Sequence, residues 1–492
     1  MSSFVAVVLV VVATILIGAF GIRISRTTSD FYVASRTVSP LWNASAIGGE
    51  YLSAASFLGV AGLILTYGTD LLWLPVGWTG GYLVLLVLVS APLRRSGAYT
   101  LPDFAEARLE SMAVRRVSSV LVVLIGWLYL MPQLQSAGLV LRTVTGAPAW
   151  VGAFVVACVV VVNVLSGGMR SITFVQAFQY WLKLTALGVP LVLMLGAWRS
   201  DGMPAVPPDD PWLQPLHRSE YAVYETYSLI LATFLGTMGL PHVLVRFYTN
   251  PDGRAARRTT LVVLALLGMF YLMPACYGFL GRVYGLPATD TVVISLPSRL
   301  IGGTLGELLT ALVSAGAFAA FLSTSSGLTV SVAGVIAQDI LGAGGVRAFR
   351  MATALALIVP FALALTVRSL PVANVVGLAF AVAASSFCPL LVLGIWWRRL
   401  TTVGAMAGLL VGGGLAATAV LATMVGGPHD GWIGVLLAEP AAWTVPVSFL
   451  VMIVVSLLTP SRIPPGVART MVRLHAPETL DVDRGSWRPR TG

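Results

Sequence analysis

ASAIGGEYLSAASFLG, residues 44–59, is the stretch from which the fold of this chain can be worked out. It lies inside an apolar segment long enough to cross a membrane, yet it holds two adjacent glycines, Gly48 and Gly49, and then a carboxylate, Glu50. A glycine inside a helix costs about 1 kcal/mol, and an acid at mid-membrane is expensive and usually functional. The stretch therefore predicts a membrane helix that is interrupted, with a functional acid beside the interruption.

The composition is that of a protein embedded in the lipid bilayer. Of 492 residues, 57% are hydrophobic and only 10% are charged, with a mean hydropathy of +0.89, whereas soluble domains carry about 25% charged residues. The net charge of +10 comes from 29 arginines and a single lysine, Lys183. Most arginines lie in short loops between apolar segments, which is typical of membrane topology rather than nucleic-acid binding. The apolar segments show no nucleophile–base pair or metal-ligand cluster, so we expect neither an enzyme nor a transition-metal protein.

The spacing of the apolar segments predicts thirteen membrane spans, each long enough to cross about 30 Å of hydrocarbon. They fall at 3–22, 38–66, 70–92, 117–141, 149–166, 172–198, 225–249, 259–281, 303–341, 349–367, 372–394, 402–425 and 440–458. With the N-terminus outside, 23 arginines fall in cytoplasmic segments and 6 in outside segments, as the positive-inside rule requires. We therefore expect a multi-pass protein of the cytoplasmic membrane with its N-terminus outside and its C-terminus in the cytoplasm.

A second interrupted helix is predicted at FLGTMGLPHVLVRF, residues 234–247, where Gly236, Gly239 and Pro241 fall within six residues. Broken backbone at membrane depth is tolerated only where it is buried or lines a cavity. The two breaks open successive sets of five spans, a pattern that indicates a transporter built from inverted repeats with its site near the midplane. The alternative is that these glycines only permit close packing of helices.

This pattern divides the chain into an inverted-repeat core and flanking segments. The predicted parts are an N-terminal extra helix and loop (1–37), a first repeat (38–198), an extracytoplasmic loop (199–224), a second repeat (225–394), two further helices (395–458) and a cytoplasmic tail (459–492).

At these residues the sequence resembles the sodium:solute symporters and, within them, the bacterial cation/acetate symporters. The likeness rests on residues 29–64, 166–183, 236–249 and 375–408. It implies an all-α LeuT-type fold with a ten-helix core in two inverted repeats. It also implies import of a small monocarboxylate such as acetate, propionate or pyruvate with a cation. One departure is that the acetate branch has Asp where this chain has Glu50.

The resemblance also implies a sodium site. In the family, the pattern Ala-x-x-Ser-Ser/Thr supplies one carbonyl and two hydroxyls to Na⁺, and here it falls on Ala320, Ser323 and Thr324. Two further carbonyls come from the first broken helix and by motif match fall on Gly49 and Leu52. Hydroxyls in membrane helices also bond back to their own helix, so packing is the alternative. The expected coupling ion is Na⁺, with H⁺ as the alternative, and no other cofactor is expected.

Two ionisable side chains at membrane depth are candidates for coupling. Glu50 could partner a cation, carry a proton, or accept hydrogen bonds that hold the break in shape. Lys183 could switch charge when it is removed from water, pair with Glu50, or attract an anionic substrate. A lysine can also extend along the membrane to the interface, which would give Lys183 no role in transport.

A small carboxylate would suit the N–H groups and positive dipole ends that interrupted helices offer. The residues predicted to take part in substrate binding or coupling are Glu50, Tyr51, Tyr129, Gln133, Lys183, Gly236, Thr237 and Gly239. Glu50 is not expected to bind a carboxylate directly, because like charges repel. Tyr129 and Gln133 lie one helical turn apart and could line the pocket or bridge helices. His242 could be a gate, a proton relay or a packing residue.

Three other functions fit the same pattern less well. They are a proton-coupled monocarboxylate carrier, a sodium symporter of another small solute such as proline, and the membrane input module of a sensor.

Overall fold

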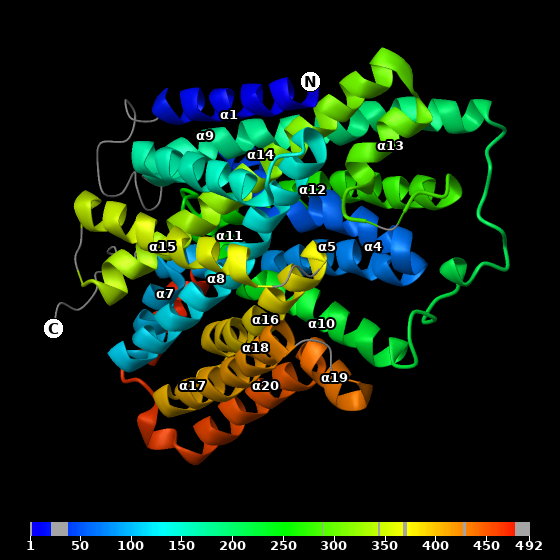
Figure 1. The fold of residues 1–492 in the computed structure, drawn as a ribbon. Helices are drawn as coiled ribbons and strands as arrows, with labels where there is room; N and C mark the ends of the chain where they lie inside the picture. The colour runs from blue at the N-terminus through cyan, green and yellow to red at the C-terminus, as the bar shows by residue number, and fades with distance from the viewer. Residues whose placement is uncertain are drawn as a thin grey trace.

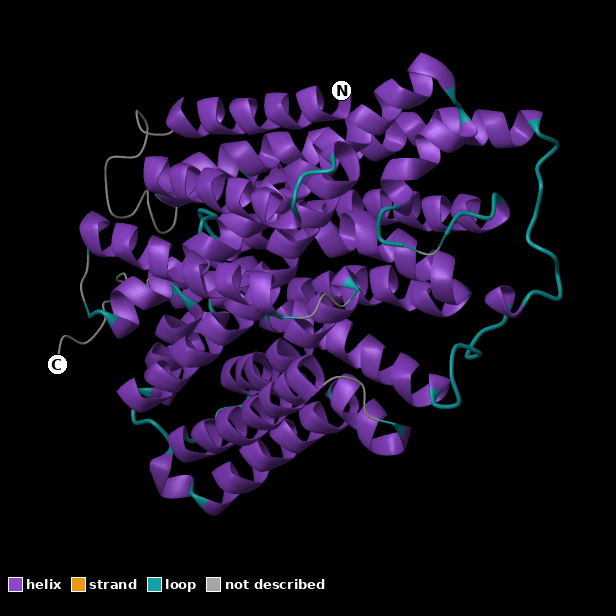
Figure 2. Ribbon diagram, in the orientation of Figure 1, coloured by secondary structure: helices purple, strands orange, loops and turns teal. Residues whose placement is uncertain are grey.

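The computed structural model describes residues 2–20, 38–287, 289–342, 345–367, 371–426 and 430–477. Within these ranges every regular element is a helix (Figures 1 and 2), which confirms the predicted all-α class. Parts of the predicted N-terminal loop (21–37) and tail (478–492), and Arg368, lie outside the described residues. The α-helices are α1 (Ser2–Phe20), α3 (Pro40–Tyr51), α4 (Val60–Tyr67), α5 (Trp73–Val84), α6 (Ser90–Ser96), α7 (Leu101–Leu109), α8 (Met112–Thr145), α9 (Ala149–Ser200), α10 (Ala222–Gly239), α11 (Pro241–Phe247), α12 (Gly253–Val283), α13 (Val292–Leu300), α14 (Gly303–Val335), α15 (Val346–Thr366), α16 (Val372–Trp396), α17 (Thr402–Gly408), α18 (Gly414–Gly426), α19 (Gly431–Ala438), α20 (Ala441–Leu458) and α21 (Val467–His475). Shorter 3₁₀ and π turns are η3 (Ala55–Gly59), η4 (Gly68–Leu72), η5 (Leu85–Val89), η6 (Pro211–Leu213), η7 (Ile336–Ile340), η8 (Leu409–Gly413) and η9 (Pro460–Arg462).

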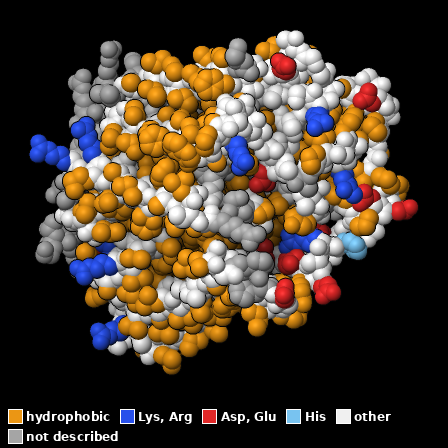
Figure 3. All heavy atoms as spheres, viewed as in Figure 1, with side chains coloured by type: hydrophobic (Ala, Val, Ile, Leu, Met, Phe, Trp, Pro, Cys, Tyr) orange, Lys and Arg blue, Asp and Glu red, His pale blue; other side chains and the backbone are white. Residues whose placement is uncertain are grey.

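The described helices form a multi-pass membrane protein. Eleven helical stretches are long and apolar enough to cross a membrane, or twelve with the bent pair α10 and α11. The sequence predicted thirteen spans. One of the eleven stretches, Ala55–Ser96, has 42 residues, roughly 63 Å if straight, and covers parts of two predicted spans. Its helical path is interrupted at Gly68, where φ is 80°. Figure 3 shows apolar side chains across most of the visible face, as contact with lipid tails requires.

The first interruption lies a few residues after the predicted place. Helix α3 continues through Gly48, Gly49 and Glu50 and ends at Tyr51. Leu52, with φ −74° and ψ 80°, leaves the helical path, and the chain resumes as the π turn η3. The prediction of a break within 47–50 was therefore wrong in position, although a break follows directly.

The two glycines of α3 serve close packing, the alternative that the sequence left open. A Cβ on Gly49 would lie 2.1 Å from the carbonyl oxygen of Gln176, and one on Gly48 would lie 2.8 Å from the ring of Tyr180. Both neighbours belong to α9. Glycine therefore lets the last turn of α3 approach the backbone of α9 closely.

The second interruption also lies just after its glycines. Helix α10 includes Gly236 and Gly239, and the break falls at Leu240, with φ −73° and ψ 116°. Pro241 then begins α11, a position that proline favours because its missing N–H has no helical partner there. The two helices meet at a bend of 43°. The predicted freeing of N–H groups at 236–239 was wrong, because these residues are helical.

The glycine Gly236 allows α10 to lie against α16. A Cβ there would stand 2.5 Å from the carbonyl oxygen of Phe380. We expect Gly236→Ala to force the two helices apart at a cost of about 1–3 kcal/mol, as overpacking does. The measurement is the apparent unfolding temperature of the purified protein in detergent.

The matched control is Gly377→Ala on α16, where an added Cβ would meet no atom of the described residues within 4 Å. That variant should be as stable as the wild type or slightly more so, since alanine favours the helix. Equal stability of Gly236→Ala and Gly377→Ala would contradict the close approach of α10 and α16.

Candidate functional site

The two interrupted helices contact each other in the interior of the bundle. Tyr51, the last residue of α3, has its hydroxyl oxygen 2.7 Å from Oγ1 of Thr237 on α10. Thr237 donates its own hydroxyl to the carbonyl of Thr233 at 2.7 Å, so Tyr51 is the donor in the contact between them. Both side chains are buried. Two of the predicted substrate-contacting residues are thus neighbours, although Thr237 lies within a regular helix.

Gln133 of α8 binds the backbone at the first break. Its Oε1 accepts the N–H of Ala54 at 2.9 Å, just after α3 has ended. Its Nε2 donates to the carbonyl of Tyr129, one turn earlier, at 3.4 Å. Both Tyr129 and Gln133 are buried. Gln133 therefore bridges α8 to the break.

An aromatic cluster surrounds the place where the breaks meet. It consists of Tyr51, Trp78, Tyr82, Tyr129, Tyr271 and Phe380, from α3, α5, α8, α12 and α16. The ring centroids of Tyr51 and Tyr82 lie 4.9 Å apart, and Trp78 lies 5.7 Å from Phe380. Four members, Trp78, Tyr82, Tyr271 and Phe380, were missed by sequence reasoning. Aromatic residues are common in membrane helices, and no local pattern marks these.

Several polar atoms around this cluster have no hydrogen-bond partner among the described residues. They are Nε1 of Trp78, the hydroxyl of Tyr82 and both ring nitrogens of His242. The His242 ring packs edge-on against Tyr129 at 5.2 Å. All are buried, and a buried polar group without a partner costs about 1–3 kcal/mol. Hydrogen-bond donors without a protein partner could serve a ligand, and the unpaired donors of Trp78 and Tyr82 are therefore candidates for one.

Glu50 is paired with an arginine inside the bundle. Nε of Arg246 on α11 lies 2.6 Å from Oε2 of Glu50, and the arginine and glutamate side chains are 1% and 2% exposed. The other guanidinium nitrogens donate to Oγ1 of Thr173 at 2.9 Å and to Oε1 of Gln176. Arg246 lies near the end of the predicted span 225–249 and was counted among the 23 cytoplasmic arginines. The structure instead buries it, because a carboxylate at this depth needs a paired cation.

The atoms predicted to bind a cation are in contact with Lys183. Its Nζ donates to the carbonyl oxygen of Gly49, to that of Leu52 at 2.7 Å, and to Oγ of Ser323 at 2.7 Å. The lysine side chain is completely buried. The alternative that Lys183 extends to the membrane interface is therefore excluded, and the ion pair with Glu50 is formed by Arg246 rather than by Lys183.

The remaining predicted cation-binding residues lie beside this contact. Thr324 donates its hydroxyl to the carbonyl of Glu50 at 2.6 Å. Ser323 donates its hydroxyl to the carbonyl of Ala320 at 3.1 Å. The five residues that the resemblance indicated are thus brought together between the first break and α14. Whether they hold Na⁺ stays a prediction.

Gly327 of α14 makes room for the acid. A Cβ on this residue would lie 2.1 Å from the carboxyl carbon of Glu50. In the sequence, Gly327 follows a run of small polar residues, STSSG (323–327), but nothing in that run predicts contact with Glu50. Gly327 therefore positions Glu50 by leaving space rather than by making a bond.

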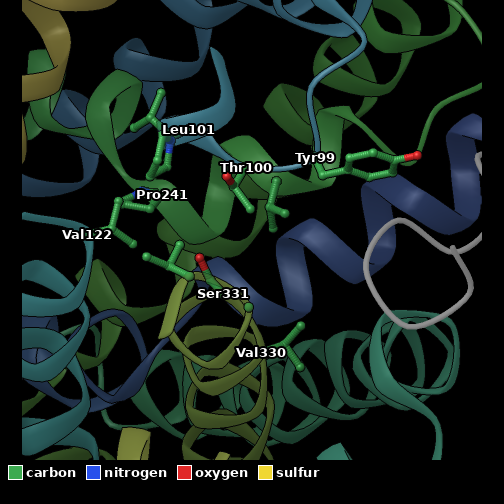
Figure 4. A pocket seen from close by; sticks show the side chains of 11 residues that line it. Tyr99, Thr100, Leu101, Val122, Pro241, Val330 and Ser331 are labelled. Carbon is green, nitrogen blue, oxygen red and sulfur yellow. The ribbon is translucent and has the colours of Figure 1, made fainter. Parts of the chain in front are cut away.

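A pocket lies beside the second break (Figure 4). It is lined by residues 99–102 before and within α7, by Pro241 and Val245 of α11, and by the end of α14 around Ser331. Pro241 is the residue directly before His242, so the pocket approaches the site from the α7 end of the bundle.

Two helices interrupted in the core of an all-helical bundle, with a buried polar site where they meet, define a membrane transporter of the LeuT type. The fold is similar to that of a Na⁺-coupled sialic acid symporter, with a TM-score of 0.71, 14% identity, and coverage of 93% of this chain and 98% of that one. It is also similar to Mhp1, a nucleobase-cation-symport-1 family transporter, with a TM-score of 0.60, 14% identity, and coverage of 90% and 98%.

The sequence comparisons identify the family. The profile described as the sodium:solute symporter family matches residues 31–412. The chain is 33% identical over 479 residues to a protein of Bacillus subtilis (strain 168) described as the uncharacterized symporter YwcA, covering 92% of this chain and 93% of that one. The chain belongs to the sodium:solute symporter family. It is a secondary active symporter and not an enzyme.

We expect the Glu50–Arg246 pair to be strongly coupled. Glu50→Gln or Arg246→Met alone should destabilise the protein by about 3–5 kcal/mol, because each leaves one buried charge unpaired. The double variant should lose much less than the sum of the two. The measurement is the free energy of unfolding of the four proteins in mixed detergent micelles.

The control is Arg282→Met, which removes a pair with Asp210 at 2.5 Å in which the arginine is 40% exposed. It should cost less than about 1 kcal/mol. Additive losses in the Glu50 and Arg246 variants would refute the coupling.

Proposed function

We propose that this symporter imports a small monocarboxylate, such as acetate, propionate or pyruvate, together with a cation by alternating access. The observation that carries the proposal is the charge of the side chains at the two breaks. Two basic side chains, Arg246 and Lys183, lie beside the first break, and the one carboxylate there, Glu50, is paired with Arg246. An anionic substrate would balance the excess positive charge in this low-dielectric region.

The unpaired donors support the same class of substrate. A carboxylate only accepts hydrogen bonds, whereas the indole Nε1 of Trp78 only donates. The hydroxyl of Tyr82 can donate as well. The rings of the aromatic cluster would contact a short alkyl or keto group.

The orientation that we propose has the N-terminus outside and the C-terminus in the cytoplasm. On the face that Figure 3 shows, Asp and Glu side chains gather toward the right, where Figure 1 places the loop between α9 and α10. The left edge of the same face shows basic side chains without acidic ones, whereas the right side shows both. The positive-inside rule assigns that left end to the cytoplasm. The pocket beside α7 and α11 would then serve the cytoplasmic exit.

The test is uptake of radiolabelled acetate into proteoliposomes that contain only this protein. Inward Na⁺ and H⁺ gradients are imposed separately at the same membrane potential. Unlabelled propionate and pyruvate should compete with the label, whereas proline should not. No uptake under either gradient, or competition by proline alone, would refute the proposed substrate.

We expect Trp78→Phe to weaken substrate binding while preserving the ring. Loss of a hydrogen bond to a charged group costs about 1.5–3 kcal/mol, so the KM for acetate should rise about tenfold or more. The matched control is Trp127→Phe on α8, whose Nε1 is likewise buried without a partner among the described residues but which is not in the aromatic cluster. An unchanged KM in Trp78→Phe would exclude this indole from the substrate site.

A further inference from the structure

We infer that Lys183 is a built-in cation that replaces Na⁺ between the first break and α14. Its ammonium group takes the position that the family pattern assigns to Na⁺, so this site does not bind the ion. The inference rests on the proposed function only in what it says about coupling. What it says about ion binding can be tested without any substrate.

The hydrogen bonds of Lys183 are complete. Three acceptors surround Nζ: the carbonyl oxygens of Gly49 and Leu52 and Oγ of Ser323. An ammonium group has three N–H donors. Ser323 gives its own proton to the carbonyl of Ala320, so its oxygen is free to accept from Lys183. The lysine therefore meets three oxygens that the sequence pattern offered to a metal ion.

The position of Nζ leaves no room for Na⁺ at the same oxygens. Leu52 O and Ser323 Oγ each lie 2.7 Å from this nitrogen, and the side chain is completely buried. A Na⁺ ion placed nearby would face the ammonium charge directly. Two like charges this close repel each other strongly in a buried site that excludes water.

The hydroxyl of the last candidate ligand is also engaged within the protein. Thr324 donates to the carbonyl of Glu50 at 2.6 Å, which ties α14 directly to the end of α3. Together, Lys183 and Thr324 join the first break to α14. A bound ion would make the same connection, but it could leave the site, whereas the ammonium group is covalently attached to α9.

This arrangement changes what is expected of coupling. A member of this family whose cation site is filled by its own side chain gains nothing from Na⁺ at that site. Uptake of the proposed substrate should therefore proceed equally well with external Na⁺ or with choline. We expect uptake to respond to an inward H⁺ gradient instead.

The test is binding of radiolabelled Na⁺ to the purified full-length protein, with no substrate present. The wild type should bind no ion above background. Lys183→Ala should bind one equivalent, because truncation frees the oxygens of Gly49, Leu52 and Ser323. Lys183→Met should bind none, because its side chain fills the space that Na⁺ would need, although it donates no hydrogen bond to the three oxygens.

Two further variants complete the experiment. Lys183→Ala combined with Ser323→Ala should lose the Na⁺ binding that the single variant gained. Thr185→Ala is the control on α9, since its hydroxyl is exposed and bonds only to the carbonyl of Trp181 in the described structure. It should behave as the wild type in every assay.

Two results would overturn the inference. One is Na⁺ binding by the wild type that Ser323→Ala abolishes. The other is absence of binding in both the wild type and a folded Lys183→Ala protein, because the freed oxygens would then not be a cation site. Failure of the proposed substrate is a separate result: acetate uptake would be absent while the Na⁺-binding pattern stayed as expected.

Discussion

The constraint on which this structure depends is that backbone freed inside a membrane must find partners within the protein. Where α3 ends, the carbonyls of Gly49 and Leu52 are left outside the regular helical pattern. Lys183 donates to both, while Gln133 accepts the N–H of Ala54 on the other side of the break. The break is stable because three helices, α8, α9 and α14, satisfy it.

The same partners determine the charge of the site. Placing Arg246 against Glu50 neutralises the acid that the first broken helix carries, and this leaves the ammonium of Lys183 in excess. A buried charge without a counter-charge is costly, and this is the physical basis of the proposal that the substrate is an anion. The proposed anionic substrate and the inferred exclusion of Na⁺ from the lysine site both rest on one arrangement of three side chains.

Glycine has a different role here from the one that helix propensity suggests. Propensity places the weak points of the helices at Gly48, Gly49, Gly236 and Gly239, yet all four are helical. They are required because α3 and α10 approach α9 and α16 more closely than any Cβ would permit. The chain leaves the helix only afterwards, at Leu52 and Leu240, and at the first of these breaks contacts with neighbouring helices replace the lost backbone bonds.

The sequence by itself determined the class of this protein, because hydropathy, arginine placement and paired glycine clusters are local properties of a membrane chain. It also indicated Glu50, Lys183, Ser323 and Thr324 as candidates. Only the tertiary structure decided their partners: Glu50 and Arg246 are 196 residues apart in sequence, and Lys183 is 134 residues from Gly49. No local pattern specifies which distant helix presents a charge to which oxygen. That pairing is decided by burial in a low-dielectric interior, because every polar group left unpaired there is costly.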